Sequence, residues 1–305
     1  MGVAAGGWYY VVQVNVIVEI EATRDGLIVR SGGQDIGTGT RTVLATTLAE
    51  ALGLVRARIT VSLGDSDLPR GPMAGGSRTT ASYVPAVLSA ADALIEALGH
   101  PGPARRFTPG IGWTDAEGAP VSWDAVFAAL TPTLVRSRRP ADRGGYALPF
   151  GVAGFRMGRK MAGSVHLAEV EVDTWTGRVV VSRYHAHFRV GRLATPALAR
   201  AQCAGGILQG IGFALHEERR TDPDGRITTL NLEDYRILGI GDAPPITLDF
   251  DETGFDHVDG GGIGLAEVCT VPVAAAIGNA VAHATGVRFR DLPLHPHRVR
   301  AGLAT

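Results

Sequence analysis

The spacing of apolar positions along the chain predicts short strands and helices in an irregular order. Partly alternating apolar and polar residues, or β-prone runs bounded by turn residues, predict strands. These stretches are residues 8–20, 26–30, 57–65, 164–173, 178–187 and 246–250. Apolar residues at helical spacing, with a glycine stop at Gly53 in the first case, predict helices. The helical stretches are residues 40–53, 81–98, 124–135, 197–217 and 273–285.

The order of these elements favours the α+β class, because strands and helices do not alternate as they do in a doubly wound parallel sheet. Residues 138–162 are rich in glycine, arginine and proline, which indicates a domain joint near residues 140–150. We therefore expect two mixed α/β subdomains, residues 1–145 and 146–305.

Composition indicates a globular protein without an electrostatic attraction to nucleic acid. Of 305 residues, 45% are hydrophobic and 19% are charged, and the formal net charge is −1. The apolar N-terminal stretch is interrupted by Gln13, Asn15 and Glu19, so it predicts a strand rather than a membrane span. One basic cluster is interpreted as a solvated helix end, and it comprises Arg136, Arg138 and Arg139.

Glycine is unusually frequent, with 41 residues in this chain, whereas it makes up about 7% of an average protein. The excess is concentrated in four clusters, which suggests loops that face a ligand more than flexible linkers. The clusters are residues 31–39, 75–76, 205–212 and 260–264.

The first cluster lies in SGGQDIGTGTRT, residues 31–42, between a predicted strand and a predicted helix. Exposed N–H groups at the start of a helix suit a phosphate group, and Gln34, Thr38 and Thr42 add neutral donors. The lysine of a P-loop and the spacing of a dinucleotide fingerprint are both missing. Phosphate binding and an ordinary tight turn therefore remain alternatives.

Two further segments have the same ambiguity. In AGGSRTT, residues 74–80, Ser77 and Thr79 are either helix N-caps or ligand contacts. The helix over residues 199–218 carries four glycines, each of which costs about 1 kcal/mol relative to alanine. A close helix contact or a cofactor would account for them. Gln202 lies on the mostly apolar face of this helix, where a buried amide needs hydrogen-bond partners that a polar ligand could supply.

Glu267 follows the glycines of GGGIGLA and precedes an apolar helix. The carboxylate either stabilises the start of that helix or acts as a buried catalytic base. Cys203 and Cys269 are interpreted as small buried hydrophobes, since two cysteines alone hold neither an iron–sulfur cluster nor a structural zinc ion. No third ligand accompanies the histidine pairs His185/His187 and His295/His297, so no protein-ligated metal site is predicted.

These four segments, in this order, resemble the molybdenum-binding large subunit of the xanthine dehydrogenase and aldehyde oxidase group. The likeness extends from about Gly6 to Val299 and is closest to aldehyde-oxidising members, which share the GQDxGTGTRT pattern. The resemblance implies molybdopterin as the cofactor, in bacteria usually as the cytosine dinucleotide, and Glu267 as the catalytic glutamate beside molybdenum. The implied cofactor-binding residues are Gln34, Gly37, Thr38, Gly39, Thr42, Gly76, Ser77, Thr79 and Gln202. The cofactor site would lie between the two subdomains, each of them a molybdopterin-binding subdomain.

The implied activity is the hydroxylation of aldehydes or N-heterocycles with oxygen derived from water. Electrons would pass to iron–sulfur clusters and FAD on partner chains. Large subunits of this family are longer than this chain, which corresponds to their C-terminal part. The expected partners are therefore an iron–sulfur subunit, an FAD subunit and, unless the chain is a truncated product, an N-terminal half of the large subunit as a separate chain. The expected location is the cytoplasm, with export alongside a partner as the alternative.

Other functions remain open at this stage. The chain departs from the family pattern at Arg189 and Thr195, ahead of the glycine-rich helix, and at Ala266, directly before Glu267. These departures and the short length favour one alternative, a catalytically inactive truncated or assembly subunit of the same family. A second alternative is an unrelated nucleotide-binding module that uses residues 33–39 for phosphate.

Overall fold

The computed structural model describes residues 1–146 and 154–304. Within these residues the strands form two four-stranded sheets and one three-stranded sheet. The strands are β1 (Gly2–Gln13), β2 (Ile17–Thr23), β3 (Gly26–Ser31), β4 (Ile59–Leu63), β5 (Arg106–Thr108), β6 (Gly112–Thr114), β7 (Pro120–Val121), β8 (Thr133–Arg138), β9 (Phe155–Val172), β10 (Val179–Arg189) and β11 (Ile246–Asp251). The helices are α1 (Thr40–Leu52), α2 (Thr79–Leu98), α3 (Trp123–Ala129), α4 (Pro196–Leu215), α5 (Val273–Thr285) and α6 (Pro296–Leu303), with short 3₁₀ turns η1 (Arg56–Arg58), η2 (Ile240–Asp242) and η3 (Glu267–Cys269).

The first sheet has the order β4-β3-β2-β8, with β3 and β4 parallel and the other pairs antiparallel. Strand β2 shows the alternation that its sequence predicts, since Val18, Ile20 and Ala22 are buried and the residues between them are half-buried. Helices α1 and α2 pack on this sheet and on each other. Their apolar faces, including Leu48 and Leu94, close the first core.

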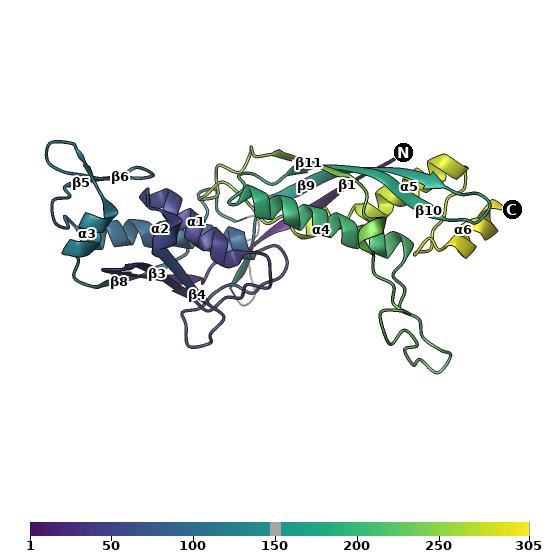
Figure 1. Cartoon of the computed structure of the whole chain (residues 1–305), viewed down its shortest axis with the longest axis horizontal. Coiled ribbons are helices and arrows are strands. Elements are labelled where there is room, and N and C mark those ends of the chain that lie inside the picture. Colours follow the sequence, from purple (N-terminus) through teal and green to yellow (C-terminus); the bar gives the residue numbers. More distant parts are fainter. Residues whose placement is uncertain (147–153, 305) are drawn as a thin grey trace.

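The second sheet has the order β1-β9-β10-β11 and lies with α4, α5 and α6 in the other half of the elongated molecule (Figure 1). Helix α5 packs on β1 and β9, and α4 packs on α5. The inward-facing residues of β10, among them Tyr184, Ala186 and Phe188, are fully buried in the second core. The mixed sheets and helices confirm the α+β class.

The first strand pairs with the second half of the chain, which the sequence pattern does not predict. Strand β1 runs antiparallel to β9, with Ala4 opposite His166 and Trp8 opposite Ala162. The predicted strand over residues 8–20 is therefore two strands in two different sheets. The division into residues 1–145 and 146–305 stays a prediction, and residues 147–150 of the expected joint lie outside the described residues.

The helix predicted over residues 124–135 is wrong in its second half. Helix α3 ends at Ala129, and β8 begins at Thr133. Pro132 accounts for the break, because a proline disfavours the helical conformation of the residue before it and has no N–H to donate. Strand β8 then pairs antiparallel with β2, with Val135 opposite Ile20.

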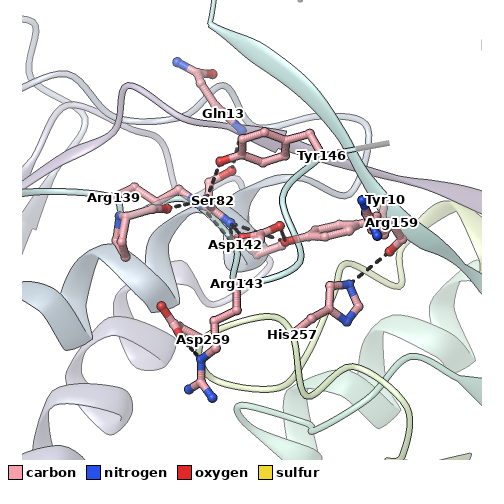
Figure 2. Close-up of polar contacts among 12 residues, drawn as sticks. Tyr10, Gln13, Ser82, Arg139, Asp142, Arg143, Tyr146, Arg159, His257 and Asp259 are labelled. Atoms are coloured by element: carbon pink, nitrogen blue, oxygen red, sulfur yellow. Dashed lines mark hydrogen bonds and ion pairs between the residues drawn. The ribbon is translucent and has the colours of Figure 1, made fainter. Parts of the chain in front are cut away.

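The interpretation of the arginine cluster as a solvated helix end is also wrong, because Arg136 and Arg138 belong to strand β8 and Arg139 is buried directly after it. The guanidinium of Arg139 donates to Asp142 at 2.5 Å, and both side chains are almost completely buried, with 0% and 1% exposed. Tyr10 of β1 donates to the same carboxylate at 2.8 Å, and the Arg139 Nε donates to the backbone carbonyl of Ala81 in α2 at 3.4 Å. Figure 2 shows this cluster, which joins β1, α2 and the segment after β8.

Two helical segments, Thr79–Leu98 and Glu267–Thr285, have the length and apolar composition of a membrane span. Both are packed within the molecule, α2 against β2 and β8 and α5 against β1 and β9. Core helices meet the same criteria of length and composition.

Candidate functional site

A cavity of about 260 Å³ lies where the two halves of the molecule meet, and all four glycine-bearing segments contribute to its wall. Thr38 comes from the loop before α1, Ser77 and Thr79 from the start of α2, and Gln202 from α4. Glu267 comes from η3, ahead of α5. Five of the ten residues that the sequence singles out therefore line one cavity, although they are far apart in the chain.

The other five residues do not line the cavity. They are Gln34, Gly37, Gly39, Thr42 and Gly76. Two of them connect the segments. The Gln34 side-chain oxygen accepts a hydrogen bond from the backbone N–H of Ala74 at 3.3 Å. Gly39, with φ +79°, packs so closely on α4 that a Cβ would lie 2.4 Å from Leu198. Their roles as cofactor contacts stay predictions.

Two helix N-termini open onto the cavity, those of α2 and α4. Neither N-cap residue, Arg78 or Thr195, makes a side-chain capping bond, and neither helix has an acidic residue in its first turn. The cavity wall includes the first-turn residues Thr79 of α2 and Leu198 of α4. Unpaired N–H groups and the positive end of the helix dipole make such a place suitable for an anion.

The N-terminus of α1 is different, because a carboxylate of the chain itself occupies it. Asp35 accepts hydrogen bonds from the backbone N–H groups of Gly37, Gly39 and Arg41 at 3.0–3.1 Å. Partial burial favours the protonated acid, but these N–H groups outweigh it and hold the pKa of Asp35 below its usual range. Asp35 lies five residues before Thr40, outside the N-cap position at which a sequence indicates a capping residue, so its role is visible only in the structure.

Two polar groups in the cavity wall have no partner among the described residues. The Thr195 hydroxyl oxygen is buried without a hydrogen bond, and the Gln202 amide also makes none. A buried hydroxyl without a hydrogen bond costs roughly 1–3 kcal/mol, so such a group usually has a ligand or water as its partner. Thr195, a departure from the family pattern in the sequence, therefore belongs to the cavity wall in the structure.

Glu267 is half-buried and makes two contacts with Ser77 across the cavity wall. The Ser77 hydroxyl donates to Oε2 of Glu267, and the backbone N–H of Glu267 donates back to the same hydroxyl oxygen at 3.2 Å. The other carboxylate oxygen, Oε1, has no hydrogen-bond partner within residues 1–146 and 154–304. It is therefore the oxygen available to a ligand.

The two cysteines lie directly behind this part of the wall and are buried free thiols, as predicted. The Cys269 thiol donates to the backbone carbonyl of Leu265 at 2.8 Å and lies 3.0 Å from the sulfur of Cys203. Burial raises the pKa of Cys269, so the thiol stays neutral. In the described part of the chain no cluster of three or more His, Cys, Asp or Glu side chains could hold a metal ion.

A larger cavity, of about 990 Å³, is lined by β10, the end of α4 and part of the segment between α4 and β11. That segment projects from the body of the molecule (Figure 1). His216, Glu218 and His295 contribute to its wall. None of the ten residues that the sequence singles out lines it. The smaller cavity is the better candidate site, because the uncapped helix starts and Glu267 face it together.

The chain matches the family model described as molybdopterin cofactor-binding domain over residues 2–244. It is 30% identical over 268 residues to the aldehyde oxidoreductase molybdenum-binding subunit PaoC of Escherichia coli K12, covering 85% of this chain and 35% of that protein. It is 31% identical over 294 residues to the xanthine dehydrogenase molybdenum-binding subunit of Escherichia coli O157:H7, covering 92% of this chain and 39% of that protein.

The fold is similar to that of the aldehyde oxidoreductase from Desulfovibrio desulfuricans, with a TM-score of 0.76 and 25% sequence identity. This similarity covers 99% of this chain and 32% of the solved chain. The chain thus spans little more than a third of the length of the curated relatives that it matches.

Proposed function

Because the chain belongs to the family of molybdopterin cofactor-binding domains, we propose that it binds molybdopterin in the cavity between its two halves, as part of a molybdenum-dependent oxidoreductase. The observation that carries the proposal is the pair of uncapped helix starts, α2 and α4, that face one cavity together with Glu267. Molybdopterin carries a phosphate group, and helix N-termini bind phosphate.

The residues of the cavity fit this cofactor. Thr195 and Gln202 have unpartnered polar groups there, and a pterin with its phosphate offers both donors and acceptors. Arg192 also lines the cavity and adds a cation near its mouth, where it pairs with Glu50 at 2.5 Å. Asp35 already neutralises the start of α1, which leaves the anion to α2 and α4.

The cavity of about 260 Å³ is smaller than most small-molecule sites, which have volumes of roughly 300–1,000 Å³. It would hold the pterin end of a larger cofactor. We assign Gly76, Thr79 and Gln202 to that end, and Ser77 to the contact with Glu267. Gln34, Gly37, Thr38, Gly39 and Thr42 would meet the dinucleotide part, and the cytosine form is the one that the sequence resemblance implies.

Glu267 would act as the catalytic base through Oε1, the carboxylate oxygen without a hydrogen-bond partner among the described residues. Molybdopterin supplies the metal and the two-electron redox chemistry when it is bound. The protein contributes a fixed carboxylate, a half-buried position that limits competition from water, and hydrogen-bond donors that orient the cofactor.

The whole enzyme would contain more than this chain, because the matched relatives are nearly three times as long. We propose an iron–sulfur subunit and an FAD subunit as partners, together with the remaining part of the molybdenum-binding subunit, in the cytoplasm. Two relatives are named for aldehydes and for xanthine, so aldehydes and N-heterocycles are the proposed substrate classes.

Metal and cofactor analysis tests the proposal. We expect one molybdenum and one pterin dinucleotide per chain after co-expression with the partners under full cofactor supply. Purified complex without either would overturn the proposal. Glu267→Gln should keep the cofactor and lose turnover. A wild-type complex that is fully loaded with cofactor but turns over none of the proposed substrates would instead favour the inactive assembly subunit.

A further inference from the structure

We propose that Ser77 is a positioning residue for Glu267, which fixes the carboxylate so that Oε1 faces the cavity. The inference rests on the proposed function and deepens it, since it gives Ser77 a role other than the cofactor contact that the sequence resemblance implies. It comes from the hydrogen bonding, the backbone conformation and the packing of the loop over residues 74–78.

The hydroxyl of Ser77 satisfies both the side chain and the backbone of Glu267. It donates to Oε2 and accepts from the backbone N–H of the same residue. A hydroxyl has one proton to donate and can accept at the same time, so a single serine side chain serves both contacts. The two bonds together fix the rotation of the carboxylate about the side chain, which one bond alone would leave free. Only Oε1 then remains open to a ligand.

The backbone of Ser77 is held in a conformation that residues with a side chain seldom adopt. Its φ is +53°, and in the described part of the chain only Lys160, with φ +69°, is another non-glycine residue in the left-handed region. Such a conformation costs roughly 1–3 kcal/mol and persists where the surroundings impose it, most often at functional sites. A structural role alone would be met more favourably by glycine at this position.

The surroundings of Ser77 do impose this conformation. The indole N–H of Trp8, in β1, donates to the carbonyl oxygen of Gly76 at 3.3 Å. The guanidinium of Arg78 donates to the carbonyl oxygen of Gly75 at 2.6 Å, and it also lies 4.2 Å from the ring centre of Phe155. Side chains of β1 and β9 therefore contact the residues on either side of Ser77. These contacts lie outside the cavity and offset the conformational free energy that the positive φ of Ser77 costs.

Double-mutant analysis of the full chain tests the proposal without the cofactor. Ser77→Ala should raise the unfolding equilibrium constant about tenfold, because a hydrogen bond to a charged group is lost. In a Glu267→Ala background the same change should raise it less than twofold. An equal effect in both backgrounds would show that the hydroxyl is not coupled to the carboxylate and would overturn the proposal.

Backbone strain is separated from the hydroxyl by two glycine variants. Lys160→Gly relieves a positive φ away from the cavity but also removes the hydrogen bond from Nζ to the carbonyl oxygen of Gly254, so its effect on the unfolding constant should be small and equal in both backgrounds. Ser77→Gly relieves the same strain but loses the hydroxyl, so it should be more stable than Ser77→Ala. If Ser77→Gly were instead less stable than Ser77→Ala, the left-handed conformation would not be strained, and the proposal would lose its second support.

The assembled enzyme provides the last test. Ser77→Ala should keep its molybdenum and pterin content and its KM while kcat falls at least tenfold, and Ser77→Thr should recover part of the kcat. Loss of cofactor in Ser77→Ala would make Ser77 a cofactor contact and overturn the positioning role. A wild-type complex without molybdenum would refute the proposed function. The coupling between Ser77 and Glu267 is measured on the chain alone, so it does not depend on that result.

Discussion

Gly264 lies so close to Ser77 that a Cβ on the glycine would be 1.6 Å from the Ser77 carbonyl oxygen. The glycine loop ahead of η3 and the loop ahead of α2 therefore meet backbone to backbone. This contact brings Glu267 to the start of α2, and it explains in physical terms why this position tolerates no side chain.

Gly264→Ala should therefore separate the two loops. We expect the free energy of unfolding to fall by roughly 1–3 kcal/mol, because backbone atoms cannot yield as a flexible side chain would, and we expect cofactor content to fall with it. Chemical denaturation and molybdenum analysis measure the two effects.

Gly278→Ala in α5 is the matched control, since its Cβ would meet nothing within 4 Å. It should stabilise by up to about 1 kcal/mol. Equal behaviour of the two variants would contradict the argument.

The buried ion pair at the junction predicts a much larger effect from a small change. Asp142→Asn keeps the shape of the side chain but leaves the buried guanidinium of Arg139 without its counter-charge. Breaking such a pair by neutralising one partner costs about 3–5 kcal/mol. Thermal or urea unfolding of the chain measures this loss of stability. Because the ion pair joins β1 to α2, we expect the packing between these two elements to weaken with it.

A surface ion pair of the same kind is the control. Arg183 pairs with Glu169 at 3.7 Å, and the two side chains are 72% and 43% exposed. Arg183→Ala should lower the free energy of unfolding by less than about 1 kcal/mol. A similar loss in both variants would show that Asp142 does not hold the junction as its burial indicates.

The sequence indicated the chemistry of the site better than the topology that assembles it. Small, hydroxyl-bearing or lone polar residues among glycines are conspicuous in a chain. This pattern points to Thr38, Ser77, Thr79, Gln202 and Glu267. That they share one cavity required the fold. Strand β1 pairs with β9, more than a hundred residues away, and alternation within a strand gives no information about its partner.

Local signals also misled where tertiary contacts decide. Arg139 follows two other basic residues and resembles a solvated cluster, yet it is buried because Asp142 and Tyr10 satisfy it. Thr195 is a departure from the family pattern in the sequence, yet it lines the cavity, and its hydroxyl oxygen is buried without a hydrogen-bond partner among the described residues. In both cases the decisive neighbour is a tertiary contact or a cavity, which residue type and spacing cannot indicate.

The free energy of unfolding should depend on pH through His166, which is completely buried in the second core. Its ring lies 5.4 Å from that of Phe188 and its Nδ1 is 3.0 Å from the hydroxyl of Tyr184. Burial lowers the pKa of His166 from 6.5 to about 4. The unfolded chain therefore binds more protons in this interval, so the stabilisation is complete above about pH 6.5 and is lost as the pH falls toward 4.

Unfolding measured between pH 7 and pH 4 checks this dependence. His166→Gln should show a shallower loss of stability over the interval than the wild-type chain. His187→Gln is the control, because His187 lies on the exposed face of the same sheet. A wild-type pH dependence that survives in His166→Gln would show that other groups titrate with unfolding.

Thr195→Val should change stability and cofactor binding in opposite directions. Valine has nearly the same shape as threonine, and the hydroxyl that it removes is buried without a partner in the cofactor-free chain. The free energy of unfolding should therefore rise by about 1 kcal/mol. Bound molybdopterin would be the missing partner, so cofactor content should fall several-fold.

Thr47→Val is the control, because the Thr47 hydroxyl is equally unpartnered among the described residues but lies in α1 away from the cavity wall. It should stabilise the chain to a similar degree and leave cofactor content unchanged. Full cofactor content in Thr195→Val would mean that this hydroxyl faces no ligand in the loaded protein.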